Sequence, residues 1–368
     1  MTTLPTIDAS GFKDLFLNNT PLMDVRAPVE FSAGAFPRTQ NLPLMNDQER
    51  HEVGKRYKAN GQDAAIALGT KLVSGDIKSE RIQAWTRFAS ENPDGALYCF
   101  RGGLRSRTTQ NWMHESGIDY PLIEGGYKAL RRFLIDSLDH WVPALPMLVV
   151  GGRTGTGKTR VLTACDRTID LEGLANHRGS SFGATLTPQP TNIDFENRLA
   201  VDYLRLSEES KTQSVVLEDE ARMIGRVSLP QVLRENLSQA PIVLLEVSLE
   251  ERVQNVLEDY VIDLSQQYQQ RDGEVDGLHT FYLHHKNSVE RVKKRLGGDN
   301  TQQVLSMLDT AYERLSKHSD ASAFEPYIAF LLNHYYDPMY DYQISFKTER
   351  IRHQGDMDSV IHFVISNG

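Results

Sequence analysis

One short segment constrains the fold of this chain more than any other. The apolar run 147–150 is followed by Gly152-Arg-Thr-Gly-Thr-Gly-Lys-Thr159, and a helical stretch begins at Lys158. These residues match the full phosphate-loop pattern, in which a strand, a glycine-rich turn and a helix hold a polyphosphate. We therefore expect the second part of the chain to be an α/β domain with a parallel sheet.

Short apolar runs alternate with helical stretches on both sides of a break at residues 140–146. Pro143 and Pro146 disfavour a helix through this segment, so a domain boundary is expected here. The expected domains are 1–140, an α/β domain with a parallel sheet, 141–250, the phosphate-loop α/β domain, and 251–368, its mainly helical C-terminal extension. Strands are expected at 21–25, 96–100, from 123, and at 147–150, 214–217, 241–247 and 359–365, and helices at 79–91, 106–116, 127–138 and 158–164.

The composition excludes several classes of protein. The 368 residues are 40% hydrophobic and 24% charged, which is typical of a globular chain. Two cysteines exclude a disulfide framework and a cysteine-built zinc site. No apolar run approaches the roughly 20 residues of a membrane span, and residues 1–12 have no secretory pattern. We expect a cytoplasmic protein with no membrane partner.

The net charge of -9 argues at first against a nucleic-acid ligand, but the charge is uneven. The first 140 residues hold 17 basic and 17 acidic side chains, so the acidic excess lies in the rest of the chain. Residues 97–107 and 286–295 are locally basic.

A cysteine loop is the first candidate site. Cys99 ends an expected strand and is followed by Phe-Arg-Gly-Gly-Leu-Arg-Ser. Consecutive glycines before a helix can turn backbone N–H groups inward to bind an anion and to favour the reactive thiolate. Arg101 and Arg105 add positive charge suited to an oxyanion. Cys165 lacks such neighbours and is expected to be a packing residue.

The spacing from Cys99 to Arg105 fits two families. It matches the Cys-x5-Arg loop of cysteine phosphatases, although Tyr98 stands where those enzymes usually have histidine. The upstream segment 24–43, with Asp-Val-Arg, Glu-Phe and Asn-Leu-Pro, resembles the opening of a rhodanese domain. In rhodaneses the loop cysteine carries sulfur as a persulfide. The resemblance implies a structural role for Asp24 and Arg26 beside the loop.

The phosphate loop and the polar segments after it supply a second candidate site. The predicted phosphate-binding residues are Gly152, Gly155, Gly157, Lys158, Thr159, His177 and Arg178. The last two belong to segment 170–183, whose length and polarity indicate a functional loop. The candidates for general acid–base catalysis or for binding a magnesium ion are Asp170, Glu172, Glu218 and Asp219. The pattern indicates a polyphosphate and does not specify ATP.

The combination of these motifs resembles the tRNA 2-selenouridine synthase family over nearly the whole chain. The resemblance rests on the cysteine loop, on Asp-Leu-Glu-Gly-Leu-Ala-Asn-His-Arg-Gly-Ser-Ser-Phe-Gly at 170–183, and on segments 41–50, 218–220 and 335–340. It implies a rhodanese-like parallel-sheet domain followed by a P-loop NTPase-like α/β domain with a helical C-terminal extension.

The same resemblance implies the chemistry. The family replaces the sulfur of wobble 2-thiouridine in the tRNAs for Lys, Glu and Gln by selenium from selenophosphate. It also transfers a geranyl group from geranyl diphosphate to that sulfur, which turns the sulfur into a better leaving group. The phosphate loop would hold the diphosphate. Cys99 would handle selenium as a selenosulfide or help to deliver selenophosphate. No tightly bound cofactor is expected, magnesium is a candidate ion, and an enzyme that makes selenophosphate is a candidate partner.

Binding of tRNA would use clustered basic side chains and an unstacked base. The candidates are Arg107, Lys128, Arg131, Arg132, Lys286, Arg291, Lys293, Lys294 and Arg295. The residues leave three other functions open: an ATP-dependent rhodanese-type sulfurtransferase, a cysteine phosphatase fused to a regulatory NTPase, and a non-catalytic P-loop switch.

Overall fold

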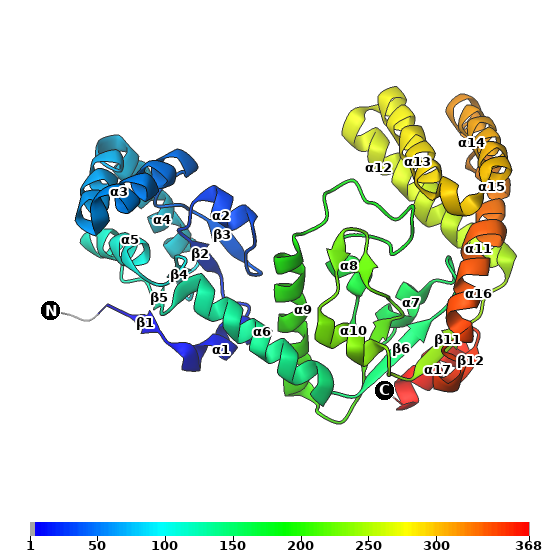
Figure 1. Cartoon of the computed structure of the whole chain (residues 1–368), viewed down its shortest axis with the longest axis horizontal. Helices are drawn as coiled ribbons and strands as arrows, with labels where there is room; N and C mark the ends of the chain where they lie inside the picture. The colour runs from blue at the N-terminus through cyan, green and yellow to red at the C-terminus, as the bar shows by residue number, and fades with distance from the viewer. Residues whose placement is uncertain (1–3, 368) are drawn as a thin grey trace. The chain divides into compact units, whose positions relative to one another are not determined.

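The structure, a computed structural model, describes residues 4–367 and divides the chain into two compact units (Figure 1). The first unit comprises residues up to Trp141 together with Thr191–Arg205, and the second comprises Val142–Pro190 and Leu206 onward. Segment 191–205, which the sequence analysis places in the phosphate-loop domain, joins the first unit because Asp194 and Asn197 hydrogen-bond the backbone of Ala35.

A five-stranded parallel sheet, in the order β1-β5-β4-β2-β3, forms the centre of the first unit. Its strands are β1 (Thr6–Ile7), β2 (Leu22–Asp24), β3 (Thr39–Asn41), β4 (Ala96–Tyr98) and β5 (Leu122–Ile123). Its helices are α1 (Phe12–Leu17), α2 (Pro28–Ser32), α3 (Asp47–Leu72), α4 (Gly75–Glu91), α5 (Leu104–Glu115), α6 (Gly126–Ala144) and most of α9 (Asn192–Glu209). The expected strands at 21–25 and 96–100 are confirmed, and β4 is fully buried at the middle of the sheet.

Helix α6 differs from the expectation for the boundary. It continues to Ala144 with Pro143 inside the helix, whereas the sequence analysis ends it at 138. Pro143 is the second-last residue of α6, so the kink or break that an interior proline causes falls where the helix ends.

The second unit contains a five-stranded parallel sheet in the order β12-β11-β6-β8-β7, with β6 at its centre. Its strands are β6 (Met147–Gly151), β7 (Thr168–Ile169), β8 (Val215–Glu218), β11 (Ile242–Leu245) and β12 (Ile351–Gly355), beside a small antiparallel pair, β9 (Met223–Ile224) and β10 (Val227–Ser228). The chain passes from β6 to β7 and β8 on one side and then to β11 on the other. This reversal places a ligand crevice at the carboxyl end of β6.

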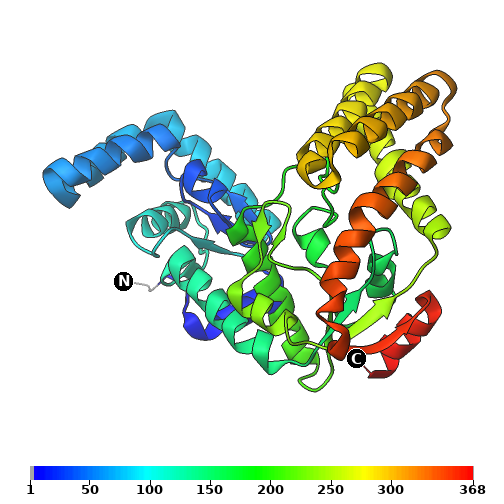
Figure 2. The same ribbon diagram turned by 45° about the vertical axis from the view of Figure 1, so that its right-hand side comes forward.

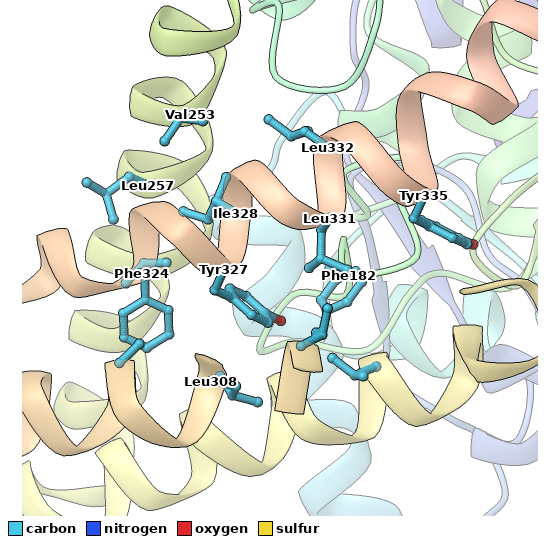
Figure 3. Packing of buried hydrophobic residues seen from close by; sticks show 14 of the residues in the cluster. Phe182, Val253, Leu257, Leu308, Phe324, Tyr327, Ile328, Leu331, Leu332 and Tyr335 are labelled. Carbon is cyan, nitrogen blue, oxygen red and sulfur yellow. The ribbon is translucent and has the colours of Figure 1, made fainter. Parts of the chain in front are cut away.

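Helices make up the rest of the second unit. They are α7 (Lys158–Thr163), α8 (Leu171–Leu174), α10 (Gln231–Leu237), α11 (Leu249–Leu257), α12 (Asp263–Asp272), α13 (Glu274–Leu296), α14 (Gly298–His318), α15 (Glu325–Leu331), α16 (Asp337–Ser345) and α17 (Met357–Asn367). Short π-helical turns at Glu258–Ile262 and Leu332–Tyr336 interrupt the series. Helices α12 to α15 form a bundle of their own (Figure 2), as the helical periodicity from 251 predicts. Phe182, from the loop after α8, packs with Tyr327 and Leu331 in the core of this bundle (Figure 3).

The expected strand at 359–365 is wrong, since this segment lies in α17. Its content of β-branched residues favours a strand. However, the buried residues Val360 and Val364 are four positions apart, which is the spacing of one helix face. The strand of this region is β12, just before it, which pairs with β11 at the edge of the sheet.

Candidate functional site

Cys99 lies directly after β4, at the carboxyl end of the first sheet. Its side chain is only 3% exposed and packs in the core of the unit. The Sγ atom lies 2.9 Å from the Oγ of Ser106, on the first turns of α5. A substrate can therefore reach the thiol only after the loop opens locally.

The loop after Cys99 has the unpaired backbone donors that the glycines predict. The N–H groups of residues 100–103 donate no hydrogen bond to any described group. Gly102 has a φ of +63°, and a Cβ there would lie 2.7 Å from the backbone N of Gly125. The turn thus needs glycine, and its free N–H groups can bind an anion.

The two arginines of the loop differ in their surroundings. Arg101 is exposed, with its guanidinium 5.8 Å from the ring centroid of Phe100. Arg105 is paired with Glu30 through both Nη atoms, at 2.5 and 3.1 Å. Burial tends to raise the pKa of Glu30, but the pairing with Arg105 outweighs it and the pKa is lowered. Arg101 is therefore the guanidinium of the two that is free for an incoming anion.

Asp24 and Arg26 brace the neighbouring strand end. The Asp24 carboxylate accepts hydrogen bonds from the backbone N, Nε and Nη2 of Arg26, and both side chains are buried. The Arg26 guanidinium lies 3.9 Å from the ring centroid of Tyr127 and donates to the carbonyl of Gly34. This arrangement is structural and leaves neither side chain free for a ligand.

The phosphate loop of the second unit runs from β6 into α7. Gly155 and Gly157 have φ values of +84° and +79°, which L-residues with side chains rarely adopt. The N–H groups of residues 153–155 and 157 donate to no other described group. Lys158 Nζ donates to the carbonyl of Gly152 at 3.1 Å, so its charge lies over the loop. The geometry is that of a cradle for a polyphosphate.

Residues that the sequence analysis missed hold this loop in place. Arg252 of α11 is 2% exposed and donates from Nε to the carbonyl of Thr154 at 2.9 Å. Its Nη atoms bind both oxygens of Asp337 at 3.0 and 2.5 Å. Asn255 donates to the carbonyl of Gly155 at 2.9 Å. The only sequence signal was the segment 335–340, which contains Asp337.

The acids at the end of β8 do not fit a magnesium site. Lys347 Nζ lies 2.7 Å from both carboxylate oxygens of Asp219. Glu218 is fully buried and accepts from the backbone N–H of Leu171. Burial and the nearby Asp170 raise the pKa of Glu218 well above its usual range, which favours the neutral acid. Asp170 itself accepts from Gly173 N–H as the N-cap of α8.

Glu172 and Glu220 instead converge near Lys158. A Cβ at Gly179 would lie 2.2 Å from an oxygen of Glu172 and 2.8 Å from one of Glu220. Burial, followed by the charge of Glu172, raises the pKa of Glu220 well above its usual range, and burial also raises that of Glu172. The pair can hold a proton beside the cradle. Glu220 was missed, although it is the third acid of the run that ends β8.

The loop 176–183 also packs near this cluster. The Arg178 guanidinium lies 5.2 Å from the ring centroid of Tyr260, whose hydroxyl donates to the Arg178 carbonyl. Burial and the charge of Arg291 lower the pKa of His177, and its buried Nδ1 has no partner among residues 4–367. Arg291, from the basic segment 286–295, donates to the carbonyl of Ser181 and so contacts this loop.

The other predicted tRNA-binding residues are spread over surfaces of both units. Arg131 is engaged by Glu196 and Asn197, and Arg132 pairs with Asp136. Exposed side chains of this set are Arg107, Lys128, Arg132, Lys286, Lys293, Lys294 and Arg295. Four of them, Lys286, Lys293, Lys294 and Arg295, lie on α13, and so does Arg291. Thr159, predicted to bind phosphate or magnesium, is exposed at the start of α7.

Two features of residues 4–367 bear on the class of protein. None of the helices there combines the length and apolar character needed to cross a bilayer. In the same residues, no group of three or more His, Cys, Asp or Glu side chains is arranged to hold a metal ion.

Comparison with known proteins identifies the family. The family model described as the tRNA 2-selenouridine synthase AAA domain matches residues 145–367. A protein of Marinobacter nauticus named tRNA 2-selenouridine synthase is 50% identical, and the alignment covers 98% of each chain. One of Pseudomonas syringae pv. syringae with the same name is 48% identical over 97% of each. A solved structure, the N-terminal domain of a protein of Clostridium difficile 630 described as ATP/GTP binding, is 31% identical, with a TM-score of 0.31. The match covers 35% of this chain and 98% of that one. The chain belongs to the tRNA 2-selenouridine synthase family and is an enzyme of that type.

Proposed function

We propose that this enzyme converts the wobble 2-thiouridine of the tRNAs for Lys, Glu and Gln to 2-selenouridine, with selenium from selenophosphate. The observation that carries the proposal is the alignment with the synthases, which spans both loops. We also propose that the protein works in the cytoplasm and receives selenophosphate from the enzyme that makes it.

The first step is proposed to take place on the phosphate loop. The thiouridine sulfur attacks C1 of geranyl diphosphate, the C1–O bond breaks, and diphosphate leaves while N3 of the base loses its proton. The unpaired N–H groups of residues 153–155 and the Lys158 ammonium support this assignment, because they can bind the charge that develops on the departing diphosphate. The Glu172–Glu220 pair lies beside Lys158 and is the candidate acceptor of the N3 proton.

The second step exchanges sulfur for selenium. Selenium of selenophosphate forms a bond to C2, and the C2–S bond breaks. Water then replaces selenium on phosphorus, and its two protons go to N3 and to the departing geranyl thiol, so the products are 2-selenouridine, geranyl thiol and phosphate. No oxidant is required. A selenosulfide on Cys99 would require a two-electron oxidation, so we assign Cys99 to the delivery of selenophosphate.

The cysteine loop suits this delivery role. Its free N–H groups at residues 100–103 and the exposed Arg101 guanidinium can bind the selenophosphate trianion. The Cys99 thiol and the Ser106 hydroxyl, 2.9 Å apart, can hydrogen-bond selenium once the loop opens.

Nucleoside analysis tests the assignment of the two loops. With thiolated tRNA, geranyl diphosphate and selenophosphate, Cys99→Ala should abolish 2-selenouridine and leave the S-geranyl nucleoside. Lys158→Ala should remove both products. Cys165→Ala, at the other cysteine, is the matched control and should retain both. Normal 2-selenouridine from either loop variant would refute the assignment, and Lys158-dependent ATP hydrolysis without diphosphate release would favour the sulfurtransferase alternative.

A further inference from the structure

A cavity of about 730 Å³ lies in the first unit, between α3 and the start of α5. Its volume falls within the 300–1,000 Å³ of typical small-molecule sites. By contrast, the cavity beside Thr154 of the phosphate loop measures about 30 Å³, which suits a single water. The large cavity has no part in the chemistry described so far.

The cavity is built by a reversal within α3. Gly61 has a φ of +80° and non-helical backbone angles, so α3 consists of two helical segments. A Cβ at Gly69 would lie 3.7 Å from Cγ2 of Val53, so the segments before and after Gly61 pack together. Both segments line the cavity, and α5 contributes Leu104, Arg105 and Trp112 on the other side.

The lining is largely apolar, and part of it is exposed. Tyr57, Ile66 and Leu104 line the cavity and are 57%, 43% and 52% exposed. Clustered exposed apolar side chains mark binding sites on soluble proteins. The inner wall includes Leu44 and Val73, which belong to the same buried cluster as Cys99.

The charged residues of the lining are mostly cationic. Arg50, Lys55, Lys58 and Arg105 line the cavity together with a single acid, Glu30. Glu30 is already paired with Arg105 at 2.5 Å and with Arg50 at 3.2 Å. An apolar chamber with a cationic lining matches a ligand that joins a hydrocarbon chain to phosphate groups.

We infer that this cavity binds the geranyl chain of S-geranyl-2-thiouridine while the selenium exchange takes place at the cysteine loop. The inference rests on the proposed function, which supplies the geranyl group. Arg105 belongs both to the cavity lining and to the helix that follows Cys99, so a geranyl thiol held here leaves next to the selenium site. The geranyl group could reach the cavity on RNA or as free geranyl diphosphate, and the binding test below separates these two sources.

Binding of two RNAs to the full chain tests the inference without turnover. Fluorescence anisotropy compares one anticodon stem-loop carrying S-geranyl-2-thiouridine with the same RNA carrying 2-thiouridine. The wild type should bind the geranylated RNA at least about tenfold more tightly. Ile66→Asp puts a carboxylate into the lining and should lose this preference, with little change in its affinity for the thiolated RNA.

The matched control is Ile77→Asp on α4. Ile77 is 42% exposed, almost the same as Ile66, but it does not line the cavity. This variant should keep the wild-type preference. Displacement of geranylated RNA by geranyl diphosphate would show that the cavity binds the geranyl group in both forms. If geranyl diphosphate displaces no RNA, the cavity binds only the geranyl group carried on RNA.

Three results would overturn the inference: no preference in the wild type, a preference unchanged in Ile66→Asp, or equal loss in Ile77→Asp. Failure of the proposed function looks different. It would appear as absence of both modified nucleosides in the turnover assay, whatever the binding preference.

Discussion

The substitution Asp337→Asn tests the clamp that holds the phosphate loop. It removes the charge that faces Arg252 and keeps nearly the same side-chain shape. Because Arg252 is 2% exposed and also donates to the Thr154 carbonyl, its guanidinium would stay buried with a neutral partner. The change should therefore affect both stability and phosphate binding.

The size of the effect follows from the burial of the pair. Removing one partner of a buried ion pair costs about 3–5 kcal/mol. Asp337 is 16% exposed, so water can partly replace it, and the lower end, about 3 kcal/mol, is expected. With a urea m-value of about 2–3 kcal/mol/M, the unfolding midpoint of the second unit should fall by roughly 1 M.

The assay measures urea unfolding and the binding of inorganic pyrophosphate to the full chain. Loosening of the carbonyl of Thr154 should weaken pyrophosphate binding about tenfold, which equals about 1.4 kcal/mol. Asp341→Asn is the matched control, because Asp341 lies one turn further along α16 and pairs with Arg153 of the same loop. That pair is about half exposed, so its loss should cost at most about 1 kcal/mol.

Equal midpoint shifts in the two variants would refute the argument from burial. Unchanged pyrophosphate affinity in Asp337→Asn, at a urea-free condition where the variant is folded, would refute the role of the clamp in shaping the loop.

Three further predictions concern titration and RNA. Burial lowers the pKa of His285 to about 3, so its contribution to stability is present above pH 6.5 and is lost as the pH falls toward 3. The variant His285→Gln should flatten this acid limb of the unfolding free energy, and an unchanged limb would contradict the assignment. The pKa of Glu220 is raised, so the pH dependence is reversed: its contribution to stability is present below about pH 4.5 and is lost as the pH rises through the folded pKa. The variant Glu220→Gln should flatten that decline in the unfolding free energy. An unchanged profile would contradict the burial of this carboxyl. Replacing Lys293 and Lys294 by Glu should weaken tRNA binding and reduce its salt dependence, whereas an unchanged salt slope would remove α13 from the RNA surface.

The sequence predicts the parts of the site that depend on local backbone chemistry. Gly155 and Gly157 adopt the positive φ values that a phosphate loop requires, and Gly102 does the same beside Cys99. These features can be read from one short segment, because the residue types and their spacing within a single turn determine them. The strands before each loop follow for the same reason.

The contacts that hold the loops could not be predicted in this way. Arg252 and Asp337 are 85 residues apart, and Arg153 and Asp341 are 188 apart. Nothing in local spacing indicates that Lys347 neutralises Asp219, which the sequence analysis proposes as a magnesium ligand. The burial of Cys99 depends equally on the packing of several distant elements.

These long-range contacts also set an order of events during synthesis. The phosphate loop leaves the ribosome 188 residues before Asp341, which at about 5–20 residues per second is a delay of roughly 10–40 s. Edge strand β12, which completes the second sheet, is made later still. A nascent chain therefore carries the glycine-rich loop long before it has Asp337 and Asp341, and its full affinity for phosphate is expected only when translation is nearly finished.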